Sequence, residues 1–171
     1  MNDNVSILRL QDAWRECERN MYYLSAALKS LDPILPMTAE KFGHLTDAQV
    51  QALDQFILRF TKLQDVMGNR FFPAILQYLQ EQYEERPMLD KLNRLEKLGY
   101  IQNAEAWQNI RITRNKFAHD YPDDWNGNAA LINVACKAAA EIHSILTRIE
   151  KKLKTEQPEL TLGKTVSLAS F

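Results

Sequence analysis

Apolar residues recur every three to four positions along most of the chain, which is the spacing of one face of an α-helix. The clearest run extends from about Val5 to Leu31, and Asp32-Pro33 follows it. Because proline cannot donate to a continuing helix, we expect the first helix to end there. Its apolar face belongs either to a core or to a contact between two copies. The apolar positions are Ile7, Leu10, Trp14, Cys17, Met21, Leu24, Leu28 and Leu31.

Turn and capping residues divide the next part of the chain into further helices. Residues 32–45 are expected to form a loop, and Thr46–Gln49 has the pattern of a capping box that opens the following helix. Gly68-Asn69 is expected to end that helix, and another is expected over about residues 71–84. A single helix that is kinked at Pro73 is the alternative.

The pattern in the second half of the chain predicts three more helices. Pro87 opens the first of them, and Gly99 stands just past its end, where a left-handed residue is favoured. Asn103 is a plausible cap for the next helix, which is expected over about Ala104–Tyr121. A loop over 122–128 separates it from the last helix.

The last helix is expected over about residues 129–154, and no segment of the chain has a convincing strand pattern. The chain therefore predicts an all-α, up-and-down bundle of five or six helices. Residues 1–155 are expected to form a single helical domain. Residues 156–171 are expected to form a C-terminal tail that is either loose or lies across a partner.

Composition and charge narrow the class of protein. The 171 residues suit one domain, and a formal net charge of -1 argues against a dedicated duplex-DNA binder. Cys17 and Cys136 have no paired spacing, so we interpret them as reduced core residues. The N-terminus lacks a signal-peptide pattern, and no apolar run approaches the length needed to cross a bilayer. We therefore expect a cytoplasmic protein with no membrane association.

The sequence contains no motif for a cofactor or for a metal. It has no Walker loop, no glycine-rich dinucleotide fingerprint and no His-Glu-x-x-His. His44 and His143 are not spaced with other ligands as zinc sites require. Nucleotide hydrolysis and zinc catalysis therefore have no support in the sequence.

One stretch, Arg114-Asn-Lys-Phe-Ala-His-Asp-Tyr121 (hereafter the octet), gathers chemically useful side chains. On a regular helix Arg114 falls in the same stripe as its apolar neighbours. An unpaired guanidinium buried there would cost about 3–5 kcal/mol, so Arg114 needs a carboxylate, carbonyl groups or a groove that is open to an anion. The apolar positions of this stripe are Trp107, Ile110, Phe117 and Tyr121.

The octet is divided by helical geometry. Asn115 and His119 are four residues apart and share the shoulder opposite Arg114. A regular helix would aim Arg114 and His119 about 140° apart. Both can serve one site only if the helix loosens near Pro122 or if two copies meet across a symmetry axis. For this reason we expect a homodimer.

These groups suit metal-independent cleavage of RNA. His119 can take or give the proton of a ribose 2′-hydroxyl, which is the role of histidine in general acid–base catalysis. Arg114 can stabilise charge on phosphoryl oxygens, and Asn115 can bind the phosphate or orient His119. Arg111 and Lys116 flank these residues and are candidates for phosphate contacts. The competing interpretation is an ordinary helix C-terminus, with His119 near the last carbonyl groups.

The motif Arg114-x4-His119-x-Tyr121 resembles the signature of HEPN proteins. It is most similar to bacterial HEPN toxins that are encoded beside a minimal nucleotidyltransferase antitoxin. The resemblance includes Asn115 after the arginine and the upstream run Leu95–Ile101, and it covers about residues 53–149 in all.

The resemblance implies a dimeric helical endoribonuclease that needs no metal or other cofactor and leaves a 2′,3′-cyclic phosphate. It implies that Arg114 and His119 are the catalytic pair and that Asn115 assists them. It also implies that Tyr121 is adenylylated by a cognate minimal nucleotidyltransferase, the antitoxin. Two alternatives stay open: a non-catalytic HEPN binding subunit that partners a nucleotidyltransferase, and a plain helical dimerisation protein.

Overall fold

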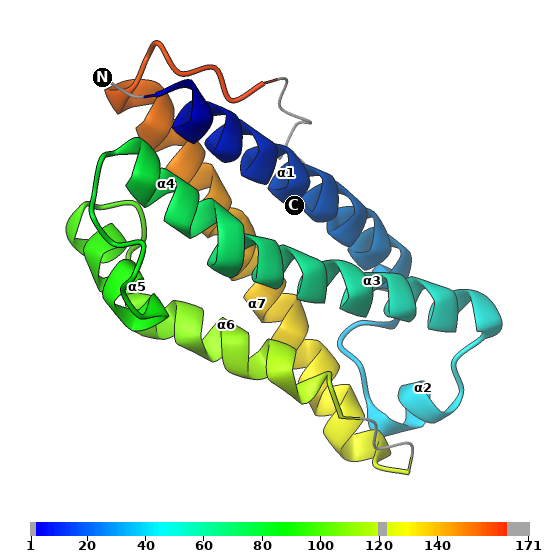
Figure 1. The fold of residues 1–171 in the computed structure, drawn as a ribbon. Helices are drawn as coiled ribbons and strands as arrows, with labels where there is room; N and C mark the ends of the chain where they lie inside the picture. Colours follow the sequence, from blue (N-terminus) through cyan, green and yellow to red (C-terminus); the bar gives the residue numbers. More distant parts are fainter. Residues whose placement is uncertain (1–2, 120–122, 164–171) are drawn as a thin grey trace.

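The computed structural model describes residues 3–119 and 123–163, and these residues are helical with no strand among them (Figure 1). Counting α3, η2 and α4 as one continuous helix, the described residues form six helices, so the predicted all-α bundle is confirmed. In chain order the elements are α1 (Asn4–Leu31), the 3-10 turn η1 (Asp32–Ile34), α2 (Ala39–Gly43), α3 (Asp47–Val66), the π turn η2 (Met67–Phe71), α4 (Phe72–Tyr78), α5 (Met88–Lys97), α6 (Ala104–Lys116) and α7 (Trp125–Glu156).

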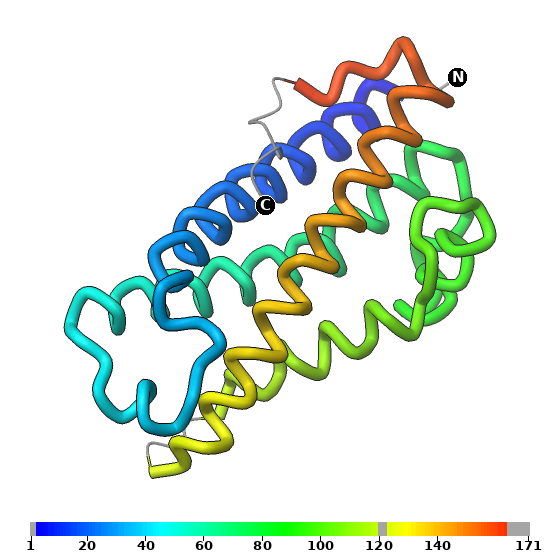
Figure 2. The backbone as a smooth tube through the Cα atoms, turned by 180° about the vertical axis from the view of Figure 1, so that it is seen from behind, coloured from blue at the N-terminus to red at the C-terminus, as the bar shows by residue number. Residues whose placement is uncertain are grey.

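The long helices lie side by side in two pairs. α1 runs along the continuous α3–α4 helix, and α6 runs along α7. α7 passes behind the other long helices in Figure 1 and lies in front of them in Figure 2. The start of α1 and the ends of α4 and α7 meet at one end of the bundle. The end of α6, the start of α7 and the short α2 lie at the other end, so the octet belongs to the α2 end.

The expected apolar face of α1 is core. Of its eight predicted positions, Ile7 and Leu28 are partly buried, and the other six are buried. Aromatic rings link the helices within this core, because Phe72 of α4 contacts Trp107 of α6 with 4.7 Å between ring centroids. Cys17 and Cys136 are unpaired, and burial raises the pKa of the Cys136 thiol to about 11.

The predicted break at Gly68-Asn69 is wrong. The chain continues from α3 through the π turn into α4, so the alternative of one continuous helix is closer, although the irregularity is a π turn and not a kink at Pro73. Met67 and Phe71 are fully buried on either side of Gly68. Their packing outweighs the weak helix propensity of one glycine, which is about 1 kcal/mol.

The predicted helix over residues 71–84 ends early, at Tyr78. Gln80 has a φ of 60°, and its N–H and that of Glu81 donate to the Gln77 and Leu76 carbonyls. This is the Schellman arrangement that usually places glycine in the left-handed position. Glycine does occupy that position at Gly99, where φ is 80° as the sequence predicts.

Two elements at the α2 end differ from the expected loops. Residues 32–45 contain the short helix α2, which Thr38 caps and which packs on α7. α7 begins at Trp125, four residues before the predicted start, because the Asp124 side chain accepts from the Gly127 N–H. A Cβ atom at Gly43 would lie 2.4 Å from the Trp125 ring, so only glycine permits this contact.

α7 is long and apolar enough to span a membrane by length and mean hydropathy, which reaches 1.3 over an 18-residue window. The expectation that no apolar run approaches this length is therefore wrong. The buried positions of α7 recur every three to four residues and pack within the bundle.

The first part of the predicted C-terminal tail packs on the domain. Leu160 and Leu162 are buried, and the Gln11 side chain of α1 donates to the Thr161 carbonyl at 2.6 Å. α7 itself extends to Glu156. The segment up to residue 163 lies along α1 (Figure 1).

Candidate functional site

α6 contains most of the predicted site residues, and interactions at its two ends fix its position. The Asn103 side chain caps its start, as expected, by accepting from the Glu105 and Ala106 N–H groups. Trp107 and Ile110 are buried in the core. Just past its end Phe117 packs edge-on against Phe60 of α3, with 5.9 Å between ring centroids.

The prediction that this helix extends to Tyr121 is wrong, because α6 ends at Lys116. The N–H groups of the next three residues donate to carbonyls only three residues earlier, which tightens the chain into a closing turn. Lys116, Ala118 and His119 are exposed, so little packing supports a further helical turn. Tyr121 and Pro122 lie outside the described residues.

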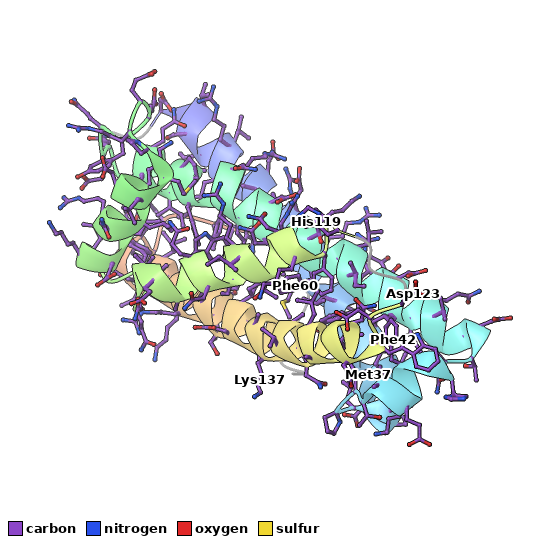
Figure 3. The ribbon with its side chains drawn as sticks, turned by 90° about the horizontal axis from the view of Figure 1, so that it is seen from below. Met37, Phe42, Phe60, His119, Asp123 and Lys137 are labelled. Atoms are coloured by element: carbon purple, nitrogen blue, oxygen red, sulfur yellow. The ribbon has the colours of Figure 1, made fainter. Side chains whose placement is uncertain are left out.

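The early end of α6 bears on the geometry of the octet. The separation of about 140° expected between Arg114 and His119 holds only for a regular helix. Since α6 ends three residues before His119, that separation does not apply to the structure. His119 is exposed, and it lies at the end of α6 beside α3 in Figure 3.

Arg114 has the carboxylate partner that its position on the helix demands. Its Nε and Nη2 atoms donate to the two oxygens of Asp65 at 3.0 and 2.8 Å. This side-on pairing uses two of the five guanidinium N–H groups and leaves three for other acceptors. The side chains of Arg114 and Asp65 are 28% and 40% exposed, so the pair stands at the surface of the bundle.

A cavity of about 200 Å³ opens beside this pair and is lined by four residues of α6: Trp107, Arg111, Arg114 and Asn115. Three of them are predicted site residues. Asn115 therefore lines the same cavity as Arg114. The geometry of a regular helix had instead grouped Asn115 with His119, on the side away from Arg114. Lys116 and His119 do not line this cavity.

The opposite wall of the cavity comes from α3 and the π turn, through Gln64, Asp65, Gly68 and Asn69. The sequence predicted a helix end at Gly68-Asn69, and none of these four residues was expected in the site. π turns occur often at functional sites, and the irregular turn here forms one side of the hollow. The local pattern gave no signal for Asp65, which is 49 residues from Arg114.

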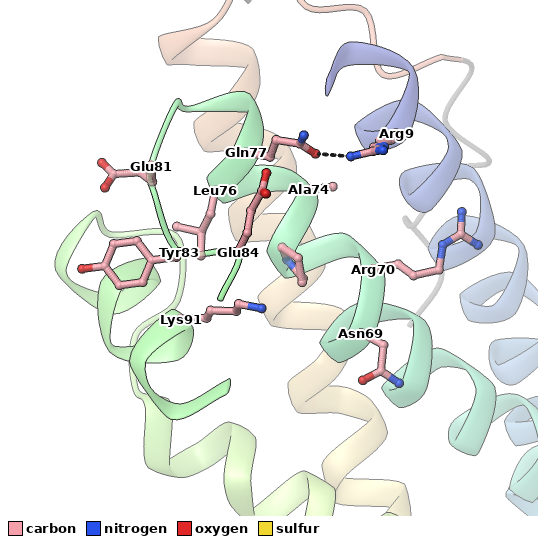
Figure 4. A pocket seen from close by; sticks show the side chains of 11 residues that line it. Arg9, Asn69, Arg70, Ala74, Leu76, Gln77, Glu81, Tyr83, Glu84 and Lys91 are labelled. Carbon is pink, nitrogen blue, oxygen red and sulfur yellow. Dashed lines mark hydrogen bonds between the residues drawn. The ribbon is translucent and has the colours of Figure 1, made fainter. Parts of the chain in front are cut away.

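A larger hollow, of about 410 Å³, lies between α1, α4 and the segment after α4 (Figure 4). It shares Asn69 with the first cavity, but no residue of the octet lines it. Several of its charged groups are already paired, since Arg9 donates to Gln77 and Arg94 holds Glu81 in two hydrogen bonds. The smaller cavity is therefore the better candidate for the predicted chemistry.

No group of three or more His, Cys, Asp or Glu side chains suited to a metal ion occurs in the described part of the chain. Arg111 and Arg114 face a single carboxylate, Asp65, across the cavity that they line. A small polar anion is the kind of ligand that this balance of charge favours. Comparison with protein-family models, curated proteins and solved structures gives no match to the chain.

Proposed function

We propose that the chain is a HEPN-type, metal-independent endoribonuclease that is neutralised by a cognate minimal nucleotidyltransferase. One observation carries the proposal: Arg111, Arg114 and Asn115 line one polar cavity near the end of α6, close in the chain to His119. The resemblance of the octet to the HEPN motif supports it. The proposal includes a homodimer in the cytoplasm.

The proposed reaction is a transesterification at an RNA phosphate. His119 takes the proton of the ribose 2′-hydroxyl, and the 2′ oxygen attacks the neighbouring phosphorus. The bond from phosphorus to the 5′ oxygen breaks, and the equivalent histidine of the second copy gives that oxygen a proton. The products are a 2′,3′-cyclic phosphate and a 5′-hydroxyl.

Arg114 stabilises the charge that develops on the phosphoryl oxygens. Asp65 holds its guanidinium side-on, so the three remaining N–H groups are available to the phosphate. Asn115 assists at the same cavity, and Arg111 and Lys116 contact flanking phosphates. The role of Asp65 is to position Arg114.

Neutralisation acts on Tyr121. The tyrosine oxygen attacks the α-phosphate of ATP on the partner nucleotidyltransferase, pyrophosphate leaves, and an AMP group remains on the hydroxyl. The added phosphate places negative charge two residues from His119, where it competes with RNA for the basic groups.

The decisive test is RNA cleavage in the presence of EDTA by the wild type and by His119→Ala. We expect cleavage by the wild type in chelator and none by His119→Ala, with unchanged helicity in both. His143→Ala, on α7, serves as the matched histidine control and should cleave normally. Equal cleavage by wild type and His119→Ala, or none by well-folded wild type without its partner, would overturn the proposal.

The second candidate function is a non-catalytic HEPN subunit that binds a nucleotidyltransferase. The observation that favours it is that Arg114 already has a carboxylate partner, as in a structural ion pair. A folded wild-type protein that binds the nucleotidyltransferase but leaves RNA intact would favour this second function.

A further inference from the structure

Trp107 presents a buried donor that the protein itself does not satisfy. Its side chain is fully buried, and its Nε1 atom has no hydrogen-bond partner. Nearly all buried polar groups of native proteins are paired, so an orphan of this kind requires an explanation. Trp107 also lines the cavity beside Arg111 and Arg114.

Because Gly68 has no side chain, a methyl-sized space lies beside the buried edge of the indole. A Cβ atom built on Gly68 would lie 3.6 Å from Cζ2 of Trp107 and 4.0 Å from its Nε1. The same position is 3.8 Å from Nε2 of Gln64, which is 5% exposed. Gly68, Gln64 and Trp107 all line the cavity, so the orphan donor, a buried amide and an unfilled space meet there.

The charges around this space favour an anion. Arg111 and Arg114 line the cavity with one carboxylate, Asp65, and no ion pair joins Arg111 to a carboxylate within the described residues. An indole N–H and a guanidinium can only donate hydrogen bonds. A ligand that accepts from both, and that carries negative charge, matches what these groups offer.

We infer that the cavity between α3, the π turn and α6 binds a phosphate group, with the Trp107 indole N–H and the Arg111 guanidinium as donors to its oxygens. The Gln64 amide gives a further donor at the inner end, and Gly68 provides the room. Identifying the ligand as a phosphate of an RNA strand rests on the proposed function. The existence of the phosphate site does not.

The test follows the indole N–H signals of Trp14, Trp107 and Trp125 by NMR of ¹⁵N-labelled protein during titration with inorganic phosphate at constant ionic strength. Trp→Phe variants assign the signals. We expect the Trp107 signal to move downfield in a saturable manner, because its hydrogen becomes bonded to a phosphate oxygen. Trp14 is the internal control, because its indole is also fully buried but does not line this cavity.

Two variants test the lining residues without removing the reporter. Gly68→Ala places its Cβ at an ordinary contact distance of 3.6 Å, so the fold tolerates it while the space beside Nε1 is filled. Arg111→Gln removes one of the donors from the exposed face of α6. Each is expected to weaken phosphate binding by about tenfold, which is the loss of roughly one hydrogen bond.

A stationary Trp107 signal, equal movement of Trp14, or unchanged binding by Gly68→Ala would each overturn the phosphate site. RNA cleavage by the same proteins separates this failure from failure of the proposed function. If the wild type cleaves RNA while the Trp107 signal does not respond to phosphate, the proposed phosphate site is wrong and the proposed nuclease function is retained. If the Trp107 signal responds to phosphate but no RNA is cleaved, the proposed phosphate site is retained and the proposed nuclease function is wrong.

Discussion

Glu18 is a carboxylic acid inside the bundle, and its replacement makes a sharp prediction about stability and pH. It lies on the buried face of α1, is 4% exposed, and its Oε1 atom has no hydrogen-bond partner. Burial raises the pKa of Glu18 from 4.5 to about 7. The adjacent Trp14 indole N–H and the Lys154 ammonium lower this pKa, and the Glu150 carboxylate of α7 raises it.

The direction of the effect follows from proton binding. Between pH 4.5 and about 7 the native state holds the Glu18 proton while the unfolded state has lost it. Stability therefore falls as pH rises through this window, and the neutral acid contributes fully only below it. The difference between the two pKa values corresponds to about 3 kcal/mol, the loss expected on passing from below pH 4.5 to above pH 7.

Glu18→Gln should remove this loss, because the amide has a similar shape and does not ionise. Urea unfolding of both proteins across this pH range gives the free energy of unfolding of each. As the pH rises, we expect the free energy of unfolding of the variant to increase by about 3 kcal/mol relative to that of the wild type. The contributions of other titrating groups cancel in this difference. Parallel stability profiles for the two proteins would refute a raised pKa at Glu18.

Three further predictions concern α6 and its surroundings. Asp65→Ala should lower the free energy of unfolding by less than about 1 kcal/mol, because the ion pair is partly exposed. The same change should lower RNA cleavage at least about tenfold through loss of Arg114 orientation, so full activity would contradict the positioning role. Asn103→Ala should cost about 1 kcal/mol in urea unfolding through loss of the α6 cap, and an unchanged midpoint would argue against that cap. Incubation with the cognate nucleotidyltransferase and ATP should add the mass of AMP to the Tyr121 peptide and not to Tyr121→Phe; a gain on another residue would remove that role.

Local signals in the sequence predicted local structure well. Apolar spacing located the buried face of α1, because a helix repeats its environment every 3.6 residues. The capping box at Thr46–Gln49 and the left-handed Gly99 are present as expected, since each depends on neighbours within a few positions. Such features can be derived from residue chemistry alone.

Features that depend on packing or on distant partners were not predictable in this way. Gly68 does not break its helix, because the surrounding core holds the chain there. Gln80 takes a conformation usually reserved for glycine, which no local pattern suggested. The need of Arg114 for a partner was predictable from its place on the helix, whereas the identity of Asp65 depends on how α3 lies against α6.

The π turn over Met67–Phe71 holds one residue more than a regular α-helical turn. It therefore changes the number of residues between α3 and α4 as well as the shape of the helix. A relative whose flanking helices superpose on α3 and α4 but which has a regular α-helix between them would be one residue shorter in this stretch. A gap in an alignment with such a relative therefore belongs inside the turn. Removal of one residue there restores ordinary helical geometry, whereas the same deletion at Ile57 would rotate everything beyond it by about 100°.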